Sequence, residues 1–282
     1  MSVFREKVAV VTGAGSGIGR ALALGLAERG ARVAISDIDP VGLDETDRML
    51  RTIGAESFAS TFDVGDASAF AEYAEAVKWH YGVVHHLYNN AGTTLGSRPF
   101  LEMRPEHFEK VMNVNFWGVV NGTRVFLPLL IESGEGALVN ISSLNGLMAQ
   151  PELSAYCGSK FAVRGFTETL RAEMMMADHN VHVVVVHPGG VKTNIANSAQ
   201  PKDEVLDDDE RIRAEERLRL YNEKLLKMSP EKAASIILNG VERGRSRIVI
   251  TREAVVLDWL VRALPQAYPR LVVAAMRRAL GK

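Results

Sequence analysis

The stretch that decides the fold is Lys7–Arg20, KVAVVTGAGSGIGR. Its first half is a short, valine-rich apolar run, which is typical of a strand buried on both faces of a parallel sheet. The helical pattern that follows leads to a second apolar run, so a β-α-β unit is complete by residue 37. Between strand and helix, Gly13, Gly17 and Gly19 permit a tight turn and let a phosphate approach the helix N-terminus. The stretch therefore predicts a dinucleotide-binding turn.

Similar apolar runs recur along the chain, with helical patterns between most of them. They are ESFASTFDV (56–64), VVHHLYNNAG (83–92), GALVNISS (136–143), VHVVVVHPGG (181–190) and SRIVIT (246–251). Repeated β-α-β units with right-handed crossovers predict an α/β fold, a Rossmann-type doubly wound parallel sheet with helices on both faces. We expect one catalytic domain over residues 1–255 and a C-terminal helical extension over residues 256–282.

The composition narrows the range of partners and compartments. The chain has 282 residues, 47% of them hydrophobic, and a formal net charge of −1, which argues against nucleic acid as a principal partner. A single cysteine, Cys157, excludes an internal disulfide framework and fits a reducing cytosol. The N-terminal residues show no apolar signal region, so we expect a cytoplasmic protein. His85 and His86 have no accompanying cysteine or carboxylate pattern, and no metal site is expected.

Asp37 indicates which dinucleotide is preferred. It ends the second predicted strand, eighteen positions after Gly19 (37 − 19 = 18). An acidic side chain there accepts hydrogen bonds from the ribose hydroxyls and repels a 2′-phosphate. Ser16 occupies a position where a basic residue could have bound that phosphate. The sequence thus favours NAD over NADP, although Arg20 and Arg32 are near in sequence; we interpret them as surface charges.

Together with six further motifs, these residues make the chain resemble the short-chain dehydrogenase/reductase family over residues 5–255. The motifs are TGAGSGIG (12–19), Asp63-Val64, NNAG (89–92), NVNFWG (113–118), NISSLNG (140–146), YCGSK (156–160) and HPGGVKT (187–193). The resemblance implies an NAD(P)-dependent oxidoreductase acting on CH–OH groups. The cofactor-binding residues that it implies are Gly13, Ser16, Gly17, Ile18, Gly19, Asp37, Ile38, Asp63, Val64, Asn90, Ala91, Gly92, Tyr156, Lys160, Pro188, Gly189, Val191 and Thr193.

The resemblance also implies four catalytic residues, Asn115, Ser143, Tyr156 and Lys160. Ser143 rather than Ser142 has the family's spacing of thirteen residues before the tyrosine (156 − 143 = 13). On a helix, Tyr156 and Lys160 share a face. A phenol pKa near 10 must fall by about three units for a base at neutral pH, which requires about 4 kcal/mol, and a lysine ammonium supplies charge of the right sign.

We therefore expect Tyr156 to be the general acid/base, with Lys160 tuning it and holding the nicotinamide ribose. Ser143 would hydrogen-bond the substrate oxygen, and Asn115 would anchor a water that links Lys160 to solvent. The expected reaction is hydride transfer between NAD(H) and a hydrophobic secondary alcohol or ketone. The alternatives are an NADP-preferring carbonyl reductase of the same family and a non-catalytic nucleotide-binding regulator.

We expect three segments to line the substrate pocket: TTLGSRPF (93–100), LNGLMAQPEL (144–153) and a charged insertion (194–228) that would act as a lid. Asn145 and Gln150 are candidate polar contacts to the substrate, with Ser143. The apolar residues of the second segment could instead be core; they are Leu144, Leu147, Met148 and Leu153. The insertion could equally be a solvated helix pair.

The C-terminal stretch 255–282 has a basic amphipathic pattern interrupted at Pro265 and Pro269. Such a pattern can pack within the chain or against a partner subunit, lie on a membrane surface, or form a disordered end. We favour packing. The family resemblance suggests a homodimer or homotetramer built on the helices that carry Asn115 and Tyr156.

Overall fold

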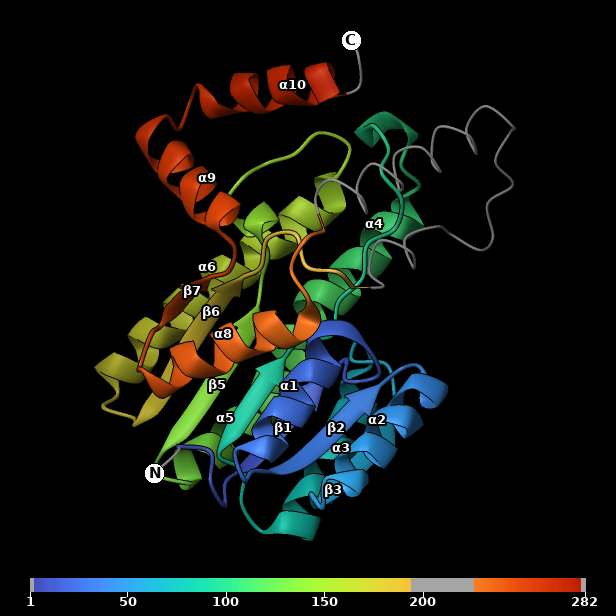
Figure 1. Ribbon diagram of the computed structural model, residues 1–282, viewed down its shortest axis with the longest axis vertical. Helices are drawn as coiled ribbons and strands as arrows, with labels where there is room; N and C mark the ends of the chain where they lie inside the picture. The colour runs from blue at the N-terminus through green and yellow to red at the C-terminus, as the bar shows by residue number, and fades with distance from the viewer. Residues whose placement is uncertain (1–2, 194–225, 280–282) are drawn as a thin grey trace.

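The computed structural model describes residues 3–193 and 226–279. Within them, seven parallel strands form one sheet in the order β3-β2-β1-β4-β5-β6-β7 (Figure 1). The strands are β1 (Val8–Thr12), β2 (Arg32–Asp37), β3 (Ser57–Thr61), β4 (His86–Asn89), β5 (Gly136–Ile141), β6 (Val181–His187) and β7 (Arg247–Val249). The doubly wound parallel sheet predicted from the sequence is confirmed.

Helices cover both faces of this sheet. They are α1 (Gly17–Glu28), α2 (Pro40–Thr52), α3 (Ala67–Tyr81), α4 (Pro105–Met112), α5 (Gly118–Glu132), α6 (Ser154–Met176), α8 (Pro230–Glu242), α9 (Arg252–Ala263) and α10 (Tyr268–Ala279). Helices α1, α2 and α8 share one hydrophobic core, and α3, α5 and α6 share the other. Helices α9 and α10 extend beyond the sheet at one end of the molecule (Figure 1).

The five inner strands, β1, β2, β4, β5 and β6, are largely buried because each one contributes side chains to both cores. In β1, Ala9 and Val11 pack in the core under α1, and Val8 and Val10 pack in the opposite one. All four side chains have no exposed surface. This two-sided burial explains why the strands read as continuous apolar runs rather than as alternating ones.

Two asparagines and a threonine form a buried polar chain between the central strands and α6. The side-chain amide of Asn89 donates to Oδ1 of Asn140 at 2.9 Å, and the amide of Asn140 donates to Oγ1 of Thr167 at 3.0 Å. Buried polar groups of this kind need partners, because an unpaired one costs about 1–3 kcal/mol. The chain therefore fixes β4, β5 and α6 in one relative register.

One helical stretch, Pro105–Glu132, is long and apolar enough to cross a membrane by length and composition alone. It comprises α4, a π-helical turn (Asn113–Trp117) and α5. In this fold Phe126 and Leu130 of α5 are fully buried against the sheet. Its hydrophobicity is thus accounted for by the core.

The carboxyl ends of the strands lie along one edge of the sheet, where ligands bind in open α/β folds. The glycine turn follows β1, Asp37 ends β2, Asn90 follows β4 and Ser143 follows β5. After β6 the chain enters the charged insertion, which lies almost wholly outside the described residues, and the lid remains a prediction. At the end of the insertion Ser229 caps α8, with its hydroxyl accepting from the Lys232 N–H at 3.3 Å.

Candidate active site

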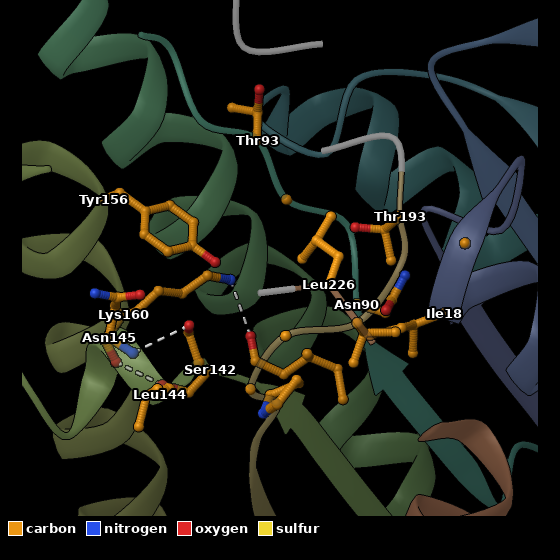
Figure 2. Close-up of a pocket in the computed structure, with 18 of the residues that line it drawn as sticks. Ile18, Asn90, Thr93, Ser142, Leu144, Asn145, Tyr156, Lys160, Thr193 and Leu226 are labelled. Carbon is orange, nitrogen blue, oxygen red and sulfur yellow. Dashed lines mark hydrogen bonds between the residues drawn. The ribbon is translucent and has the colours of Figure 1, made fainter. Parts of the chain in front are cut away.

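A cavity of about 1530 Å³ runs along the carboxyl edge of the sheet. Pockets for one small molecule usually measure about 300–1,000 Å³, so this one has room for a dinucleotide with a second ligand beside it. Every residue that the sequence assigns to cofactor, substrate or catalysis lines the cavity, with the exception of Asn115. Figure 2 shows Ile18, Asn90 and Thr193 across the cavity from Tyr156 and Lys160.

The glycine turn has the geometry of an anion site. Gly13 has a φ of 65°, which favours glycine, and a Cβ on Gly19 would lie 1.9 Å from the Gly13 carbonyl oxygen. The N-cap Ser16 makes no side-chain capping bond within the described residues, and the first turn of α1 holds no acidic side chain. The first N–H groups of α1 therefore suit a phosphate group. The residues present fit a dinucleotide.

The carboxylate of Asp37 accepts a hydrogen bond from the glycine turn. Its Oδ2 accepts from the Gly15 N–H at 2.7 Å, and its Oδ1 accepts from the Asp39 N–H at 2.9 Å. Both residues line the cavity, so the charge of Asp37 lies at the wall where a ribose would bind. This position agrees with the role that the sequence predicts for Asp37.

The interpretation of Arg20 as a surface charge is wrong. Its guanidinium is largely buried, donates to the Gly15 carbonyl oxygen and to Thr46 Oγ1, and pairs with Glu45 at 2.6 Å. The Arg32 guanidinium lies over the ring of Tyr81, 5.5 Å from its centroid. Neither arginine is among the cavity-lining residues. Both guanidinium groups are therefore engaged by protein partners, that of Arg20 at the glycine turn itself.

The segment after β4 is tied directly to the glycine turn. The side-chain amide of Asn90 donates to the carbonyl oxygens of Thr12 and Gly13 at 2.9 and 3.1 Å. After β3, Asp63 accepts from the Gly65 N–H at 2.8 Å and stabilises its own turn. These contacts hold the nucleotide side of the cavity in shape without a ligand.

Tyr156 and Lys160 lie side by side near the start of α6. Lys160 Nζ is 5.8 Å from the centroid of the Tyr156 ring, and the tyrosine hydroxyl points toward the ammonium end of the lysine (Figure 2). The ammonium donates to the Ile141 carbonyl oxygen at 3.0 Å, and the side chain is almost fully buried. Burial lowers the pKa of Lys160 to about 8, so the lysine stays charged at neutral pH.

The two serines after β5 face different partners. Ser143 lines the cavity, and its Oγ accepts from the Asn145 N–H at 3.1 Å. Ser142 donates to the Lys160 carbonyl oxygen at 2.8 Å, so its hydroxyl is bonded to backbone. Behind them, Nδ1 of His187 lies 2.9 Å from the Ser143 carbonyl oxygen.

Asn115 lies behind the cavity wall, fully buried in the π-helical turn between α4 and α5. Its amide donates to the Thr93 carbonyl oxygen at 2.9 Å and to Ser159 Oγ at 3.0 Å, and its oxygen accepts from the Thr93 N–H at 2.7 Å. Both amide hydrogens are thus engaged. The side chain joins the segment after β4 to α6, and the water link to Lys160 remains a prediction.

The candidate substrate contacts bond to each other. The amide of Asn145 donates to Gln150 Oε1 at 3.3 Å and lies 3.5 Å from Cys157 Sγ. Leu144 and Met148 line the cavity as expected. Leu147 and Leu153 do not line it, and for Leu147 the alternative of a core position is the one that the structure has. The 3₁₀ turn at 144–146 means that side chains in this segment do not alternate between cavity and core as they would in a strand. Leu147 is buried, with 1% of its surface exposed. Of the segment 93–100, Thr93 alone is among the lining residues.

Sequence reasoning missed the contribution of the C-terminal extension to this cavity. The residues that it supplies, with the turn before α9, are Thr251, Arg252, Glu253, Leu257, Leu260, Leu271, Val272, Ala275 and Met276. The amphipathic pattern was the available signal. One face of the extension lines the cavity, and its packing against a partner subunit or a membrane surface remains a prediction. Lys110, Lys227 and Lys232 also line the cavity and had no sequence signal.

A sequence model of the family described as short chain dehydrogenase matches residues 7–204. The chain belongs to the short-chain dehydrogenase/reductase family. It is 48% identical over 279 residues to SadH of Mycobacterium tuberculosis, which is named as an oxidoreductase, covering 99% of this chain and 98% of SadH.

Solved structures agree with this family assignment. A short-chain dehydrogenase/reductase from Burkholderia phymatum in complex with NAD superposes with a TM-score of 0.87 at 30% identity, over 95% of this chain and 97% of that one. A short-chain dehydrogenase from Mycobacterium paratuberculosis bound to NAD has a TM-score of 0.75 at 25% identity, over 88% and 97%. Membership of this family makes the protein an oxidoreductase. Among the described residues, no group of three or more His, Cys, Asp or Glu side chains could hold a metal ion.

Proposed function

We propose that the protein transfers a hydride between NAD(H) and a hydrophobic secondary alcohol or ketone, with Tyr156 as general acid/base. The proposal rests on one observation above all. The buried ammonium of Lys160 lies beside Tyr156 in the same cavity that the glycine turn enters. A protein that only binds nucleotides has no evident use for a buried lysine beside a tyrosine at this place.

Different residues along the cavity would hold different parts of the dinucleotide. The N-terminus of α1 would hold the pyrophosphate, Asp37 the adenosine ribose, and the segment Pro188–Thr193 the nicotinamide end. When bound, NAD⁺ supplies the hydride acceptor and NADH the hydride donor. The chain's own task is to orient the substrate carbon and to move one proton.

In the oxidative direction, the hydroxyl proton of the alcohol passes to the Tyr156 phenolate as the hydride leaves the carbon that bears this hydroxyl. In the reductive direction, Tyr156 returns that proton to the carbonyl oxygen. Lys160 stabilises the phenolate because its positive charge is held nearby in a buried, weakly screened position. Ser143 donates a hydrogen bond to the substrate oxygen and stabilises the charge that develops there.

Two observations support NAD over NADP. The Asp37 carboxylate lies where a 2′-phosphate would be repelled, and Arg20 and Arg32 are engaged with other partners. The Burkholderia and Mycobacterium structures, both of which contain NAD, are consistent with this preference.

We place the enzyme in the cytoplasm as a homodimer or homotetramer. Trp117 and Phe161 support association: they lie on the π-helical turn and on α6, and 52% and 38% of their surfaces are exposed. Exposed aromatic side chains of this kind are enriched at subunit interfaces. Contact between the C-terminal extension and a membrane remains a prediction.

The test is Tyr156→Phe, measured in two ways. Calorimetric titration should give the same NAD⁺ affinity as the wild type within about twofold, because the glycine turn, Asp37 and Lys160 are unchanged. Turnover of secondary alcohols should fall by at least about 100-fold, the usual contribution of a general acid/base. Near-normal turnover would contradict the assignment. A wild type that binds neither NAD⁺ nor NADP⁺ would contradict the enzyme proposal itself.

A further inference from the structure

Part of the cavity wall is formed by helices that lie outside the 7–204 region of the family match. We infer that α9 and α10 form an apolar wall that binds the hydrocarbon chain of the substrate, so that the enzyme prefers alcohols or ketones with a long aliphatic chain. This inference rests on the proposed function and specifies the substrate class for the same site.

Helical spacing selects one face of each helix for the cavity. On α9 the lining residues are Arg252, Glu253, Leu257 and Leu260, and the last three are spaced four and three residues apart. On α10 they are Leu271, Val272, Ala275 and Met276. Residues at such spacings share one side of a helix. From Leu257 onward every lining side chain of the two helices is apolar, whereas Arg252 and Glu253 are charged.

These apolar side chains are only partly covered by the protein. Leu271 is 47% exposed, although it lines the cavity. Leu257, Leu260, Val272 and Met276 are intermediate in exposure. Apolar surface that faces a cavity connected to the catalytic residues favours an apolar occupant, because the ligand and the wall are removed from water together. Leu144 and Met148 add apolar surface to the same cavity.

Specific contacts fix the wall in place. The Tyr268 hydroxyl accepts a hydrogen bond from the Ala149 N–H at 3.3 Å, which joins the start of α10 to the segment that carries Gln150. Asp258 of α9 pairs with Arg247 of β7 at 2.7 Å, and both side chains are largely buried. Helix α9 is thus attached to the sheet and α10 to the substrate side of the cavity.

The apolar run on α10 has a definite length. From Leu271 to Met276 the helix rises by about 7.5 Å, at 1.5 Å per residue. A substrate chain must therefore contain several methylene groups to cover this surface. Each buried methylene should improve binding by about fourfold at most, which is the equilibrium equivalent of its transfer from water.

The decisive experiment is a chain-length series from 2-butanol to 2-decanol, oxidised with NAD⁺. For the wild type, kcat/KM should rise with each added methylene until the wall is covered. Ala275→Trp would fill the space beside α10 and should remove the gain for the longer alcohols, so that the ratio of decanol to butanol falls at least tenfold. The matched control is Ala274→Trp, because Ala274 is exposed like Ala275 but does not line the cavity.

A second pair of variants tests α9 in the same way. Leu260→Gln places an amide on the wall, whereas Val256→Gln changes a residue that is 66% exposed and does not line the cavity. Leu260→Gln should lower the decanol-to-butanol ratio, and Val256→Gln should retain the wild-type ratio. Equal ratios within both pairs would overturn the inference.

A binding measurement separates this inference from the proposed function. Displacement of anilinonaphthalene sulfonate should occur at a lower concentration of 2-decanone than of 2-butanone, and Ala275→Trp should abolish the difference. If the wild type oxidises short alcohols but shows no chain-length dependence in either assay, the wall inference fails and the proposed function stands. If no alcohol or ketone reacts with either cofactor, but 2-decanone still displaces the dye at a lower concentration than 2-butanone, the proposed function fails and the inference about the apolar wall stands.

Discussion

Nδ1 of His187 lies 2.9 Å from the carbonyl oxygen of Ser143, and the histidine side chain is completely buried. A carbonyl oxygen only accepts, so Nδ1 must carry the proton in this pair. The end of β6 thereby holds the backbone of the residue that should bind the substrate oxygen. His187 is a positioning residue.

The first prediction follows from this pair. His187→Phe should leave the Ser143 carbonyl oxygen without its donor, and an unsatisfied buried group costs about 1–3 kcal/mol of stability. It should also lower kcat, because Ser143 is then less well oriented. His187→Asn can place its amide nitrogen near the position of Nδ1 and should recover most of both losses. Thermal unfolding and steady-state kinetics on the three proteins provide the check; a failure of Asn to recover kcat would argue against positioning.

The second prediction concerns acid stability. Burial lowers the pKa values of His187 and His86 to about 4. In the unfolded chain both should titrate near 6.5, so the unfolded state binds more protons between these values. Stability is therefore fully present above pH 6.5 and is lost as the pH falls toward 4, by up to about 3 kcal/mol for each histidine.

Urea unfolding at a series of pH values measures this loss. His187→Asn should make the dependence shallower between pH 6.5 and pH 4. His179→Asn is the matched control, because His179 is exposed and should leave the slope unchanged. If the His187 variant has the wild-type slope, then the cause of the acid sensitivity lies elsewhere.

The third prediction concerns the cost of the buried lysine. Burial lowers the pKa of Lys160 to about 8, from about 10.5 in the unfolded chain. The unfolded state thus holds more protons between these values, and the wild type should gain stability as the pH rises from 8 to 10.5, by up to about 3 kcal/mol. Lys160→Met has no such group, so its stability relative to the wild type should be greatest at neutral pH. Its turnover should be largely lost. A stability difference that does not change with pH would contradict the buried charge.

The fourth prediction concerns the choice of cofactor. Asp37→Asn retains an oxygen that can accept from the Gly15 N–H but removes the negative charge. We expect the affinity for NADP⁺ relative to NAD⁺ to rise by about fivefold or more, because at least about 1 kcal/mol of repulsion at short range is removed. Asp44→Asn is a suitable control, since Asp44 pairs with Arg48 on α2 and does not line the cavity. Calorimetry with both dinucleotides tests this, and an unchanged preference would mean that Asp37 does not discriminate.

The sequence was most informative where residue type and position are both dictated by backbone geometry. Gly13 follows the first parallel strand and Asp37 ends the second. Their position at the same edge of the sheet could therefore be predicted from strand order alone. Tyr156 and Lys160 could be paired by helical spacing. Ser142 and Ser143 could be distinguished by spacing from Tyr156, and they do face different partners.

Other features depend on contacts that a single sequence does not specify. The amphipathic pattern of residues 255–282 showed that one face needs a partner but did not identify the cavity as that partner. Leu144 and Leu147 are chemically alike, and only the local turn directs one to the cavity and the other to the core. Arg20 is similar, because its charge suggests solvent whereas its long side chain reaches the carbonyl of Gly15.

The hydrogen bond from Ala149 to Tyr268 joins two segments that are 119 positions apart. Each segment therefore forms part of the other's environment, and neither can be exchanged alone without loss of fit. A chimera that receives the last thirty or so residues of a relative would need the relative's residues 144–153 as well. Among related chains, residues 144–153 and the C-terminal extension should therefore vary together rather than independently.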